Sequence, residues 1–454
     1  MVEAVSPHAS VNSQAHHGDE HYANHLAGVN ETRAVVSTGD IYNERGVLVM
    51  KAGARLDKSV YAKIKKHQLA ESLASQVSVD GTLNRDTLAE EFRRLLGTYL
   101  DVQIISETLK LRPELDAIVR SYAINPVTAQ KLTVFKHQYP QSFDGVLLGA
   151  WLAALIARVH GCSRGDVTDA FVAALCRDLG LLHIDPAIVH KTEELNPAEW
   201  RALQSHTIVS KMILQSTSSA SGDVLRAIVE HHERGHGLGY PAGIFGDGIS
   251  LLGRIVGLAD TMQAVRIGRF ERDKRNLADM MPTLNINALN FGDDVYRAVM
   301  EMLRGGGVPP TLDECAQRGD GTTLSAVEGG WQKLAKVSSF LETLTGVLGT
   351  MQESDALKRM KAITKQIETV VTRSGLLTEE MGQWLSQCQG KTLAPEDGRV
   401  ICEMELMISE LKWQLRDARK AYDQLFSTIK DNTSPALKAL QKMADELSHA
   451  LDPQ

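Results

Sequence analysis

The sequence has few cysteines and no long apolar segment, and both absences narrow its class. Its 454 residues include five cysteines, an odd number, and the pattern Cys-x-x-Cys does not occur. A disulfide framework and a thiolate zinc site are therefore not expected, and a reducing cytoplasm is the predicted compartment. The longest uncharged apolar run, residues 145–157, is shorter than the roughly 20 residues that cross a bilayer, so it predicts a buried helix and no membrane span.

A basic surplus and a leader segment are also lacking. The formal net charge is −7, so the totals give no indication of a nucleic-acid partner, because such proteins usually carry an excess of Lys and Arg. The N-terminus has no basic start followed by an apolar core, so a signal peptide is not expected. The remaining composition, 43% hydrophobic and 23% charged, is typical of globular proteins, and the length suits two or three domains.

The pattern along the chain predicts a mainly all-α protein with a small β-containing module near its N-terminus. Residues 1–30 are polar and rich in histidine and are interpreted as a disordered tail, with adventitious metal binding as the alternative. In the module over residues 31–85, two β-prone runs flank Asn43–Gly46, which predicts a hairpin with its glycine in the left-handed region. Helical periodicity follows in a lead-in over residues 86–139 and a domain over residues 140–310.

The C-terminal region, residues 325–454, is predicted to be helical as well. Its apolar residues step alternately by four and three, at Met404, Ile408, Leu411, Leu415, Ala418, Tyr422 and Leu425. Such a stripe indicates either a coiled-coil dimer or a helix packed in an intramolecular bundle, since both bury one apolar face. A homo-oligomer is expected on the first interpretation. Glu410 and Lys412 lie outside the stripe.

Potential metal ligands occur in the middle of the chain. They are the imidazoles and carboxylates of Asp178, His206, His231, His232 and Asp260. Imidazole together with carboxylate suits iron, manganese or zinc. The residues are far apart in sequence, so they form no local motif, and a single histidine is more often structural than a ligand. Asp260 is the stronger indication, because a carboxylate on an apolar helix is costly to bury unless it is paired or binds a metal.

These segments resemble the HD-GYP family in order, spacing and connecting residues. The family pattern runs LLHDIGK, then HHExxDGxGYP, then RIVxxADxxDAL. This chain has LCRDLGL at 175–181, HHERGHGLGYP at 231–241 and RIVGLADTMQAV at 254–265. The resemblance covers more than a third of the chain. It implies an all-α, HD-superfamily metal phosphodiesterase that hydrolyses cyclic di-GMP in bacterial signal transduction.

The resemblance also implies a role for each matching position. Asp178 matches the bridging Asp of the HD pair and would be the catalytic residue of an active enzyme, while His206, His231, His232 and Asp260 match further metal ligands. In the family the metals activate water and offset charge on the phosphate.

Two further features of the resemblance concern ligand and partner. Arg269 and Arg272 are candidates for contact with ligand phosphate, because a guanidinium can bind phosphate through two hydrogen bonds. For Arg269 a solvated helix residue is the equal alternative. The loop residues Gly239, Tyr240 and Pro241 are linked in the family to contacts with diguanylate cyclase domains, although they would also fix a tight turn.

Several family positions are substituted in this chain. The departures are Gly145, Arg177, Leu181, His236 and Gln263. Arg177 replaces the His of the HD pair, and an arginine has no lone pair for a metal. Gly145 replaces an earlier ligand His. No geometric argument lets His160, His183 or His236 replace the lost ligands, so at most one metal is expected, and the positive charge of Arg177 is hypothesised to replace that of a second.

The sequence therefore predicts a degenerate HD-GYP signalling module with impaired catalysis, which acts by binding cyclic di-GMP or a diguanylate cyclase-type protein. The expected cofactor is a single divalent metal, iron or manganese, or none. The alternative is an active metal-dependent phosphodiesterase with a reduced metal site. A third interpretation is an oligomeric interaction protein dominated by its C-terminal helices.

Overall fold

The computed structural model describes residues 20–217, 220–311, 321–350, 354–391 and 393–428. The chain forms two compact units, of which the first comprises Met1–His232 with Ser250–Ala264 and the second comprises Glu233–Ile249 with Val265–Gln454. The predicted domain over residues 140–310 therefore contributes to both units. A sequence pattern cannot indicate this division, because the chain leaves one core and enters the other within a continuous motif.

The small N-terminal module contains two short antiparallel ladders. Strand β1 (Val35–Ser37) pairs with β4 (Val77–Val79), and β2 (Ile41–Tyr42) pairs with β3 (Leu48–Met50). The predicted hairpin is confirmed, and its Gly46 has φ 72°, a conformation that glycine adopts without strain. Helices α2 (Lys58–Ile64) and α3 (Leu73–Gln76) complete the module.

The expected disordered tail is wrong in part, because residues 20–29 form a helix. Tyr22 and Leu26 of this helix are fully buried. The Tyr22 hydroxyl donates to Oε1 of Gln130 at 2.8 Å, which lies on α7 (Pro126–Gln138). Polar composition concealed this helix, since a few apolar residues suffice when a distant helix covers them. Residues 1–19 lie outside the described residues.

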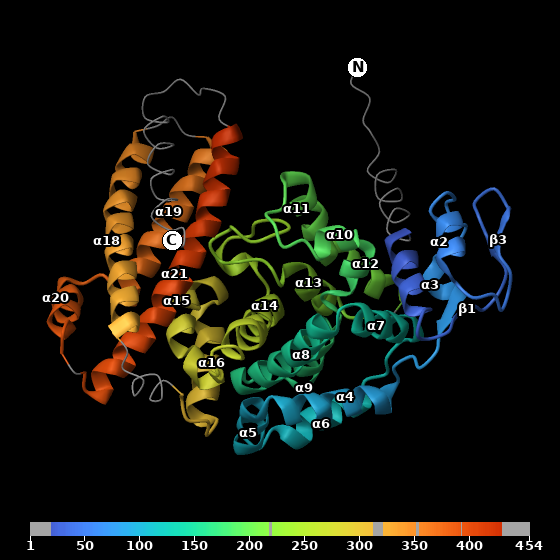
Figure 1. Ribbon diagram of the computed structural model, residues 1–454, viewed down its shortest axis with the longest axis horizontal. Helices are drawn as coiled ribbons and strands as arrows, with labels where there is room; N and C mark the ends of the chain where they lie inside the picture. Colours follow the sequence, from blue (N-terminus) through green and yellow to red (C-terminus); the bar gives the residue numbers. More distant parts are fainter. Residues whose placement is uncertain (1–19, 218–219, 312–320, 351–353, 392, 429–454) are drawn as a thin grey trace. The chain divides into compact units, whose positions relative to one another are not determined.

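The first unit is otherwise helical, as predicted. It contains helices α4 (Arg85–Thr98), α5 (Leu100–Thr108), α6 (Arg112–Ser121), α7, α8 (Pro140–His160), α9 (Arg164–Cys176), α10 (Pro186–Val189), α11 (Pro197–Gln204), α12 (His206–Thr217), α13 (Gly222–Glu230) and α14 (Leu251–Ala264), with the 3-10 turn η1 (Leu179–His183). Helix α8 packs against α9 and α14, and α13 packs against α9, α12 and α14 (Figure 1). The ends of α9, α12 and α13 carry four of the predicted metal ligands, and the fifth, Asp260, lies within α14.

The apolar run predicted to be a buried helix forms the middle of α8. The whole helix is 21 residues long, and by length and composition alone it could cross a membrane. However, 78% of its most apolar window is buried inside the protein, as expected of a core helix. The helix begins at Pro140, whose missing N–H is harmless in the first turn, and it ends at Gly161 with φ 92°.

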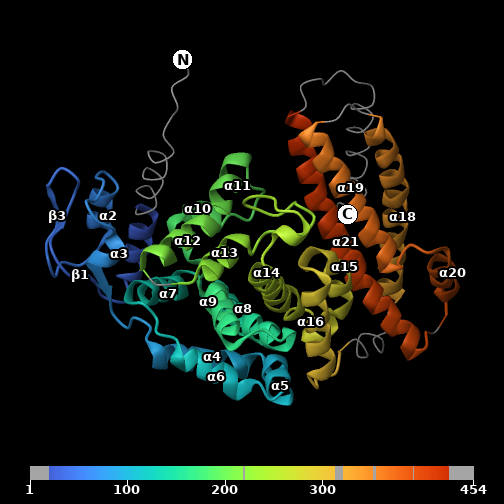
Figure 2. The ribbon, with the colours of Figure 1, turned by 180° about the vertical axis from the view of Figure 1, so that it is seen from behind.

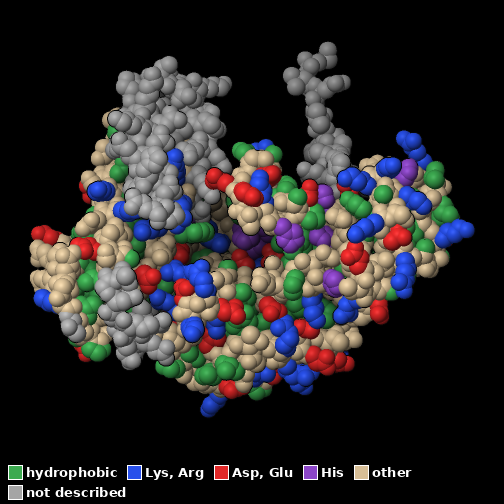
Figure 3. Space-filling model, in the orientation of Figure 1, with side chains coloured by type: hydrophobic (Ala, Val, Ile, Leu, Met, Phe, Trp, Pro, Cys, Tyr) green, Lys and Arg blue, Asp and Glu red, His purple; other side chains and the backbone are tan. Residues whose placement is uncertain are grey.

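The second unit is helical too. It contains the turn η2 (Gly246–Gly248), the π-helical turn η3 (Val265–Phe270), the turn η4 (Leu277–Met280) and helices α15 (Met281–Phe291), α16 (Asp293–Gly305), α18 (Gly321–Gly349), α19 (Asp355–Ser374), α20 (Glu379–Cys388) and α21 (Pro395–Thr428). Figures 1 and 2 show α18, α19 and α21 side by side. Figure 3 shows basic and acidic side chains interspersed on the face that it draws.

The apolar stripe of α21 faces the interior of its own chain. Its residues from Met404 to Tyr422 belong to one hydrophobic core with α18, α19 and Ile286 of α15. The bundle interpretation therefore accounts for the stripe without a second copy, and the homo-oligomer stays a prediction. The side chain of Leu425 lies outside the described residues.

The cysteines of the described residues differ in state. Cys402 is disulfide-bonded, whereas Cys162, Cys176 and Cys388 are free thiols. Cys315 lies outside the described residues. An odd cysteine count without close spacing could not indicate this bond, because disulfide formation depends on proximity in the fold.

Candidate metal centre

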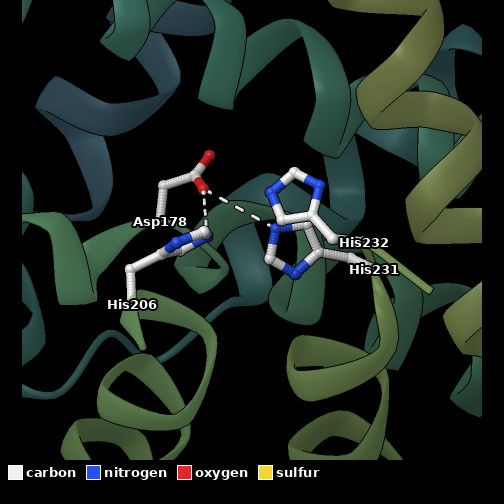
Figure 4. A group of neighbouring side chains, drawn as sticks. All are labelled: Asp178, His206, His231 and His232. Carbon is white, nitrogen blue, oxygen red and sulfur yellow. Dashed lines mark ion pairs between the residues drawn. The ribbon is translucent and has the colours of Figure 1, made fainter. Parts of the chain in front are cut away.

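Four of the predicted ligands meet at helix ends in the first unit. Asp178 follows α9, His206 begins α12, and His231 and His232 follow α13. Their potential ligand atoms all lie within 4.8 Å of one another, and Figure 4 shows the four side chains directed toward a common point. Residues that are distant in sequence are thus brought together in the arrangement that the motif order predicted.

Two of the histidines are fixed in the tautomer that a metal ligand needs. Nδ1 of His206 lies 2.7 Å from the carbonyl oxygen of Leu203, and Nδ1 of His231 lies 2.6 Å from that of Ile228. A carbonyl oxygen only accepts, so each Nδ1 carries the proton and the neutral ring keeps a lone pair on Nε2. Such a second hydrogen bond is a common feature of metal-ligating histidines.

The same Nε2 atoms face a carboxylate. Oδ1 of Asp178 lies 3.5 Å from Nε2 of His206 and 3.7 Å from Nε2 of His231. Burial lowers the pKa of His206 to about 4, so this ring is neutral at pH 7 and directs a lone pair toward the carboxylate. Two lone-pair groups at this separation are unfavourable unless a cation lies between them, which makes the cluster chemically suited to a metal ion.

Arg177 is fully buried and lies between two carboxylates. Its Nε is 2.9 Å from Oδ1 of Asp260 and 3.1 Å from Oδ2 of Asp178. Nη1 donates to the carbonyl of Ala174 at 2.7 Å. Burial acts to raise the pKa of Asp178, but the positive charge of Arg177 holds it well below its ordinary value. Asp178 therefore stays ionised beside a permanent positive charge.

Two glycines make room for the substituted side chains. A Cβ on Gly149 would lie 2.8 Å from Nη1 of Arg177, and a Cβ on Gly145 would lie 2.4 Å from Oε1 of Gln263. Gln263 in turn donates to Oδ1 of Asp260 at 3.2 Å. The departures at Gly145 and Gln263 are therefore linked in space, as are Gly149 and Arg177. The sequence motifs gave no indication of Gly149.

The donor set fits a divalent metal ion. Asp178, His206, His231 and His232 supply three imidazoles and a carboxylate, a set that suits divalent iron, manganese or zinc. Gly145 and Arg177 offer no further donor, because their side chains are only a hydrogen atom and a guanidinium. Asp260 pairs with Arg177, although its Oδ2 is 3.8 Å from Nδ1 of His232.

The remaining histidines considered as substitutes are engaged elsewhere. Nε2 of His183 lies 2.8 Å from Nζ of Lys131, and its ring stacks on Tyr22. His160 contacts Cys162, with Nδ1 and Sγ 3.7 Å apart. Leu181 lies in η1 and offers no donor. Neither His160 nor His183 belongs to the cluster of Asp178, His206, His231 and His232.

The loop that contains Gly239, Tyr240 and Pro241 belongs to the second unit. It is held by Glu233, for which the sequence motifs predicted no role. The carboxylate of Glu233, which is 2% exposed, accepts hydrogen bonds from the backbone N–H groups of Ala242, Gly243 and Ile244 at 2.7, 3.1 and 2.8 Å. A carboxylate with three backbone donors is a strong, charge-assisted clamp. It fixes the segment that follows the cis bond between Tyr240 and Pro241.

His236, at the family position of an Asp, also acts within this loop. Its Nδ1 accepts from the backbone N–H of Leu238 at 3.0 Å, and burial lowers its pKa to about 3. His236 is therefore a neutral structural residue. The two predicted phosphate contacts lie further along the second unit, where Arg269 pairs with Asp273 at 3.8 Å and Arg272 is largely exposed.

Comparison with known proteins relates the chain to one family. Residues 128–295 match the model of the HD domain. A 3'3'-cGAMP-specific phosphodiesterase of Vibrio cholerae is 40% identical over 115 residues, which cover 25% of each chain. A cyclic di-GMP phosphodiesterase of Thermotoga maritima is 34% identical over 154 residues, which cover 34% of this chain and 42% of that protein. The chain is an HD-GYP-like protein.

The match is confined to part of each protein. A probable cyclic di-GMP phosphodiesterase of Vibrio cholerae, 34% identical over 175 residues, is covered over 39% of its length. The HD-GYP-like chain thus spans less than half of each of these relatives. Helices α18 to α21 lie beyond the residues that match the HD domain. The residues that match the HD domain include the histidine and aspartate cluster.

Proposed function

We propose that this HD-GYP-like protein is a signalling module that binds a cyclic dinucleotide and hydrolyses it poorly or not at all. The observation that supports impaired catalysis is the guanidinium of Arg177, which lies 3.1 Å from Asp178 and 2.9 Å from Asp260. A guanidinium offsets one of the two negative charges but cannot accept a ligand oxygen into a coordination shell. Arg177 thus keeps a positive charge at the site, but it cannot take part in the activation of water by a metal.

Cyclic di-GMP is the first candidate ligand, and 3'3'-cGAMP is the second. The relatives are named as phosphodiesterases of these two compounds, and both carry two phosphodiester groups between purine nucleosides. The candidate contacts on this chain are the metal cluster and Arg269, with Arg272 beside it. The loop at Gly239–Pro241 is a candidate contact for a diguanylate cyclase-type protein.

One iron or manganese ion on Asp178, His206, His231 and His232 would supply a Lewis acid for a phosphate oxygen. The residues of the chain prepare that position. The carbonyls of Leu203 and Ile228 hold the rings of His206 and His231 with Nε2 inward, and Arg177 keeps Asp178 ionised. The cluster therefore serves ligand binding with a single ion.

The second candidate function is an active phosphodiesterase with a reduced metal site. It is favoured by the retention of four donors within 4.8 Å, since a module that only binds proteins has no need of them. The two functions differ in what the protein does to cyclic di-GMP, so turnover decides between them.

The test combines metal content, turnover and binding on the full chain. After loading with manganese or iron, we expect no more than one equivalent of metal per chain, no linear product from either dinucleotide, and measurable binding in a calorimetric titration. Asp178→Ala is the control for metal-dependent signal. Product that forms with the unaltered protein and disappears in Asp178→Ala would establish the enzyme instead, and the absence of binding to both dinucleotides would refute the proposal altogether.

A further inference from the structure

Two arginines that follow α14 belong to one turn of the second unit. Arg269 lies in the π-helical turn η3, and Arg275 lies six residues later in the segment that leads to η4. The backbone N–H of Arg275 donates to the carbonyl oxygen of Phe270, the residue after Arg269, at 2.7 Å. Two guanidinium groups carried by one turn repel each other unless negative charge lies nearby.

Helix α21 supplies that negative charge. Oε2 of Glu405 lies 2.9 Å from Nη2 of Arg275, and the same carboxylate acts electrostatically on Arg269. Helix α21 begins at Pro395, well beyond residue 295 where the HD-domain match ends. The carboxylate that pairs with Arg275 therefore comes from a part of the chain that the family domain does not include, whereas Arg269 pairs with Asp273 at 3.8 Å inside the matched residues.

The pairing leaves Arg275 incompletely satisfied. Its side chain is nine-tenths buried, and among the described residues its Nη1 has no hydrogen-bond partner. A buried guanidinium nitrogen without an acceptor costs free energy. A phosphate group offers several oxygens in the geometry that a guanidinium binds through two hydrogen bonds, whereas Glu405 contacts only Nη2. Arg275 is thus better matched to a phosphate than to its present partner.

Helix α21 itself is held by other contacts. Glu410, one turn further on, is partly buried and accepts from Nδ2 of Asn287 at 2.6 Å. Nε2 of Gln414 donates to Oδ1 of the same Asn287 at 3.0 Å. Glu405 is 39% exposed, so its carboxylate can turn toward water while Glu410 and Gln414 keep the helix in place. Exchange at Arg275 needs a side-chain rotation and no unfolding.

We propose that Glu405 is an intramolecular competitor for a phosphate site formed by Arg269 and Arg275. In the free protein the carboxylate of Glu405 occupies Arg275, and a phosphate group of an incoming cyclic dinucleotide displaces it. This inference rests on the proposed function, because the dinucleotide is the ligand whose phosphate competes. It adds Arg275 to the ligand contacts and makes the C-terminal bundle a regulator of affinity.

The test compares two isosteric variants of the same helix. Glu405→Gln removes the competing charge, while Glu403→Gln removes an equal charge from a residue of the same helix, whose carboxylate lies 3.4 Å from Nε of Arg399. With cyclic di-GMP as the titrant, we expect the Kd of Glu405→Gln to fall at least about fivefold, since a ligand gains affinity when the competent state is more populated. Glu403→Gln should stay within twofold of the unaltered protein. Circular dichroism verifies that both variants keep their helix content.

A double-mutant cycle separates competition from long-range attraction. Arg275→Gln should weaken binding, and Glu405→Gln should give no gain in the Arg275→Gln background, because the competition acts through Arg275. Equal affinities of Glu405→Gln and Glu403→Gln, or a gain that persists without Arg275, would overturn the inference while leaving the proposed function intact. If no variant binds cyclic di-GMP or 3'3'-cGAMP, the proposed function fails. In that case inorganic pyrophosphate replaces the dinucleotide as the titrant. If Glu405→Gln and Glu403→Gln bind pyrophosphate with equal affinity, the inference is overturned.

Discussion

Replacement of Arg177 by methionine is the most direct test of the metal-centre geometry. The change keeps side-chain volume and removes the charge that lies 2.9 Å from Asp260 and 3.1 Å from Asp178. Removing one partner of a buried ion pair typically costs 3–5 kcal/mol, because the other charge stays buried and unpaired. The side chains of Asp178 and Asp260 are 17% and 14% exposed, so water relieves part of this cost. We expect a loss of about 3 kcal/mol.

The measurement is hydrogen exchange of peptides from α9 and α14, which reports the free energy of local opening around the site. The matched control is Arg158→Met, because Arg158 pairs with Glu114 at 3.0 Å but is 42% exposed. Exposed pairs contribute 0–1 kcal/mol, so the control should change opening by less than about 1 kcal/mol. An Arg177→Met variant that opens no faster than Arg158→Met would refute the bridging role of Arg177.

The pH dependence of the stability of the Arg177→Met variant is an independent test, because the direction of the change with pH can be predicted. In the unaltered protein the pKa of Asp178 is depressed below its ordinary value of 3.8. The stability that this pairing contributes is therefore fully present above that value and is lost as the pH falls through the depressed pKa. Without Arg177 the carboxylate of Asp178 loses its main counter-charge and its pKa should rise, so the variant gains stability on mild acidification. The difference in stability between the unaltered protein and the Arg177→Met variant should become smaller as the pH falls from 7 toward 4.

Three further changes test other parts of the structure. Gly149→Ala should destabilise the first unit by about 1–3 kcal/mol through overlap with Arg177, whereas Gly346→Ala on α18, where a Cβ meets nothing within 4 Å, should raise the melting temperature because alanine favours helix. In the metal-free protein, the folded pKa of His206 near 4 lies below the ordinary 6.5, so stability should fall between about pH 6.5 and 4, and His206→Gln should flatten that part of a melting-temperature profile. Glu233→Gln should accelerate amide exchange of residues 242–244 by at least about tenfold, and unchanged exchange would remove its clamping role.

Much of the fold class could be predicted from the sequence, because helical periodicity and turn chemistry are local. The hairpin at Asn43–Gly46 followed from β-prone runs around a glycine, and it formed as expected. The helix over residues 20–29 was missed, because its stability comes from burial of Tyr22 and Leu26 against another helix. Local composition carries no information on such a distant contact.

The sequence could predict which residues belong to the candidate site, but it could not predict which contacts hold the surrounding residues in place. The order of the motifs named Asp178, His206, His231 and His232, which the fold gathers within 4.8 Å. It could not show that Glu410, outside the apolar stripe of α21, is partly buried against Asn287. Nor could it assign Glu233 a role, since its three backbone partners become neighbours only when the loop closes on it.

The contacts of Gly145 and Gly149 change the meaning of the missing ligands. Taken one by one, the substitutions at Gly145, Arg177 and Gln263 look like separate losses that a single reversion could repair. In the structure a side chain at position 145 would overlap Gln263, and Arg177 fills the space that Gly149 leaves open. A histidine restored at position 177 alone would still lack a partner donor at position 145, and a histidine at 145 alone would overlap Gln263. Arg177, Asp178, Asp260 and Gln263 thus form one packed, hydrogen-bonded cluster, and we expect binding of a second ion to require a coordinated change of Gly145, Arg177 and Gln263.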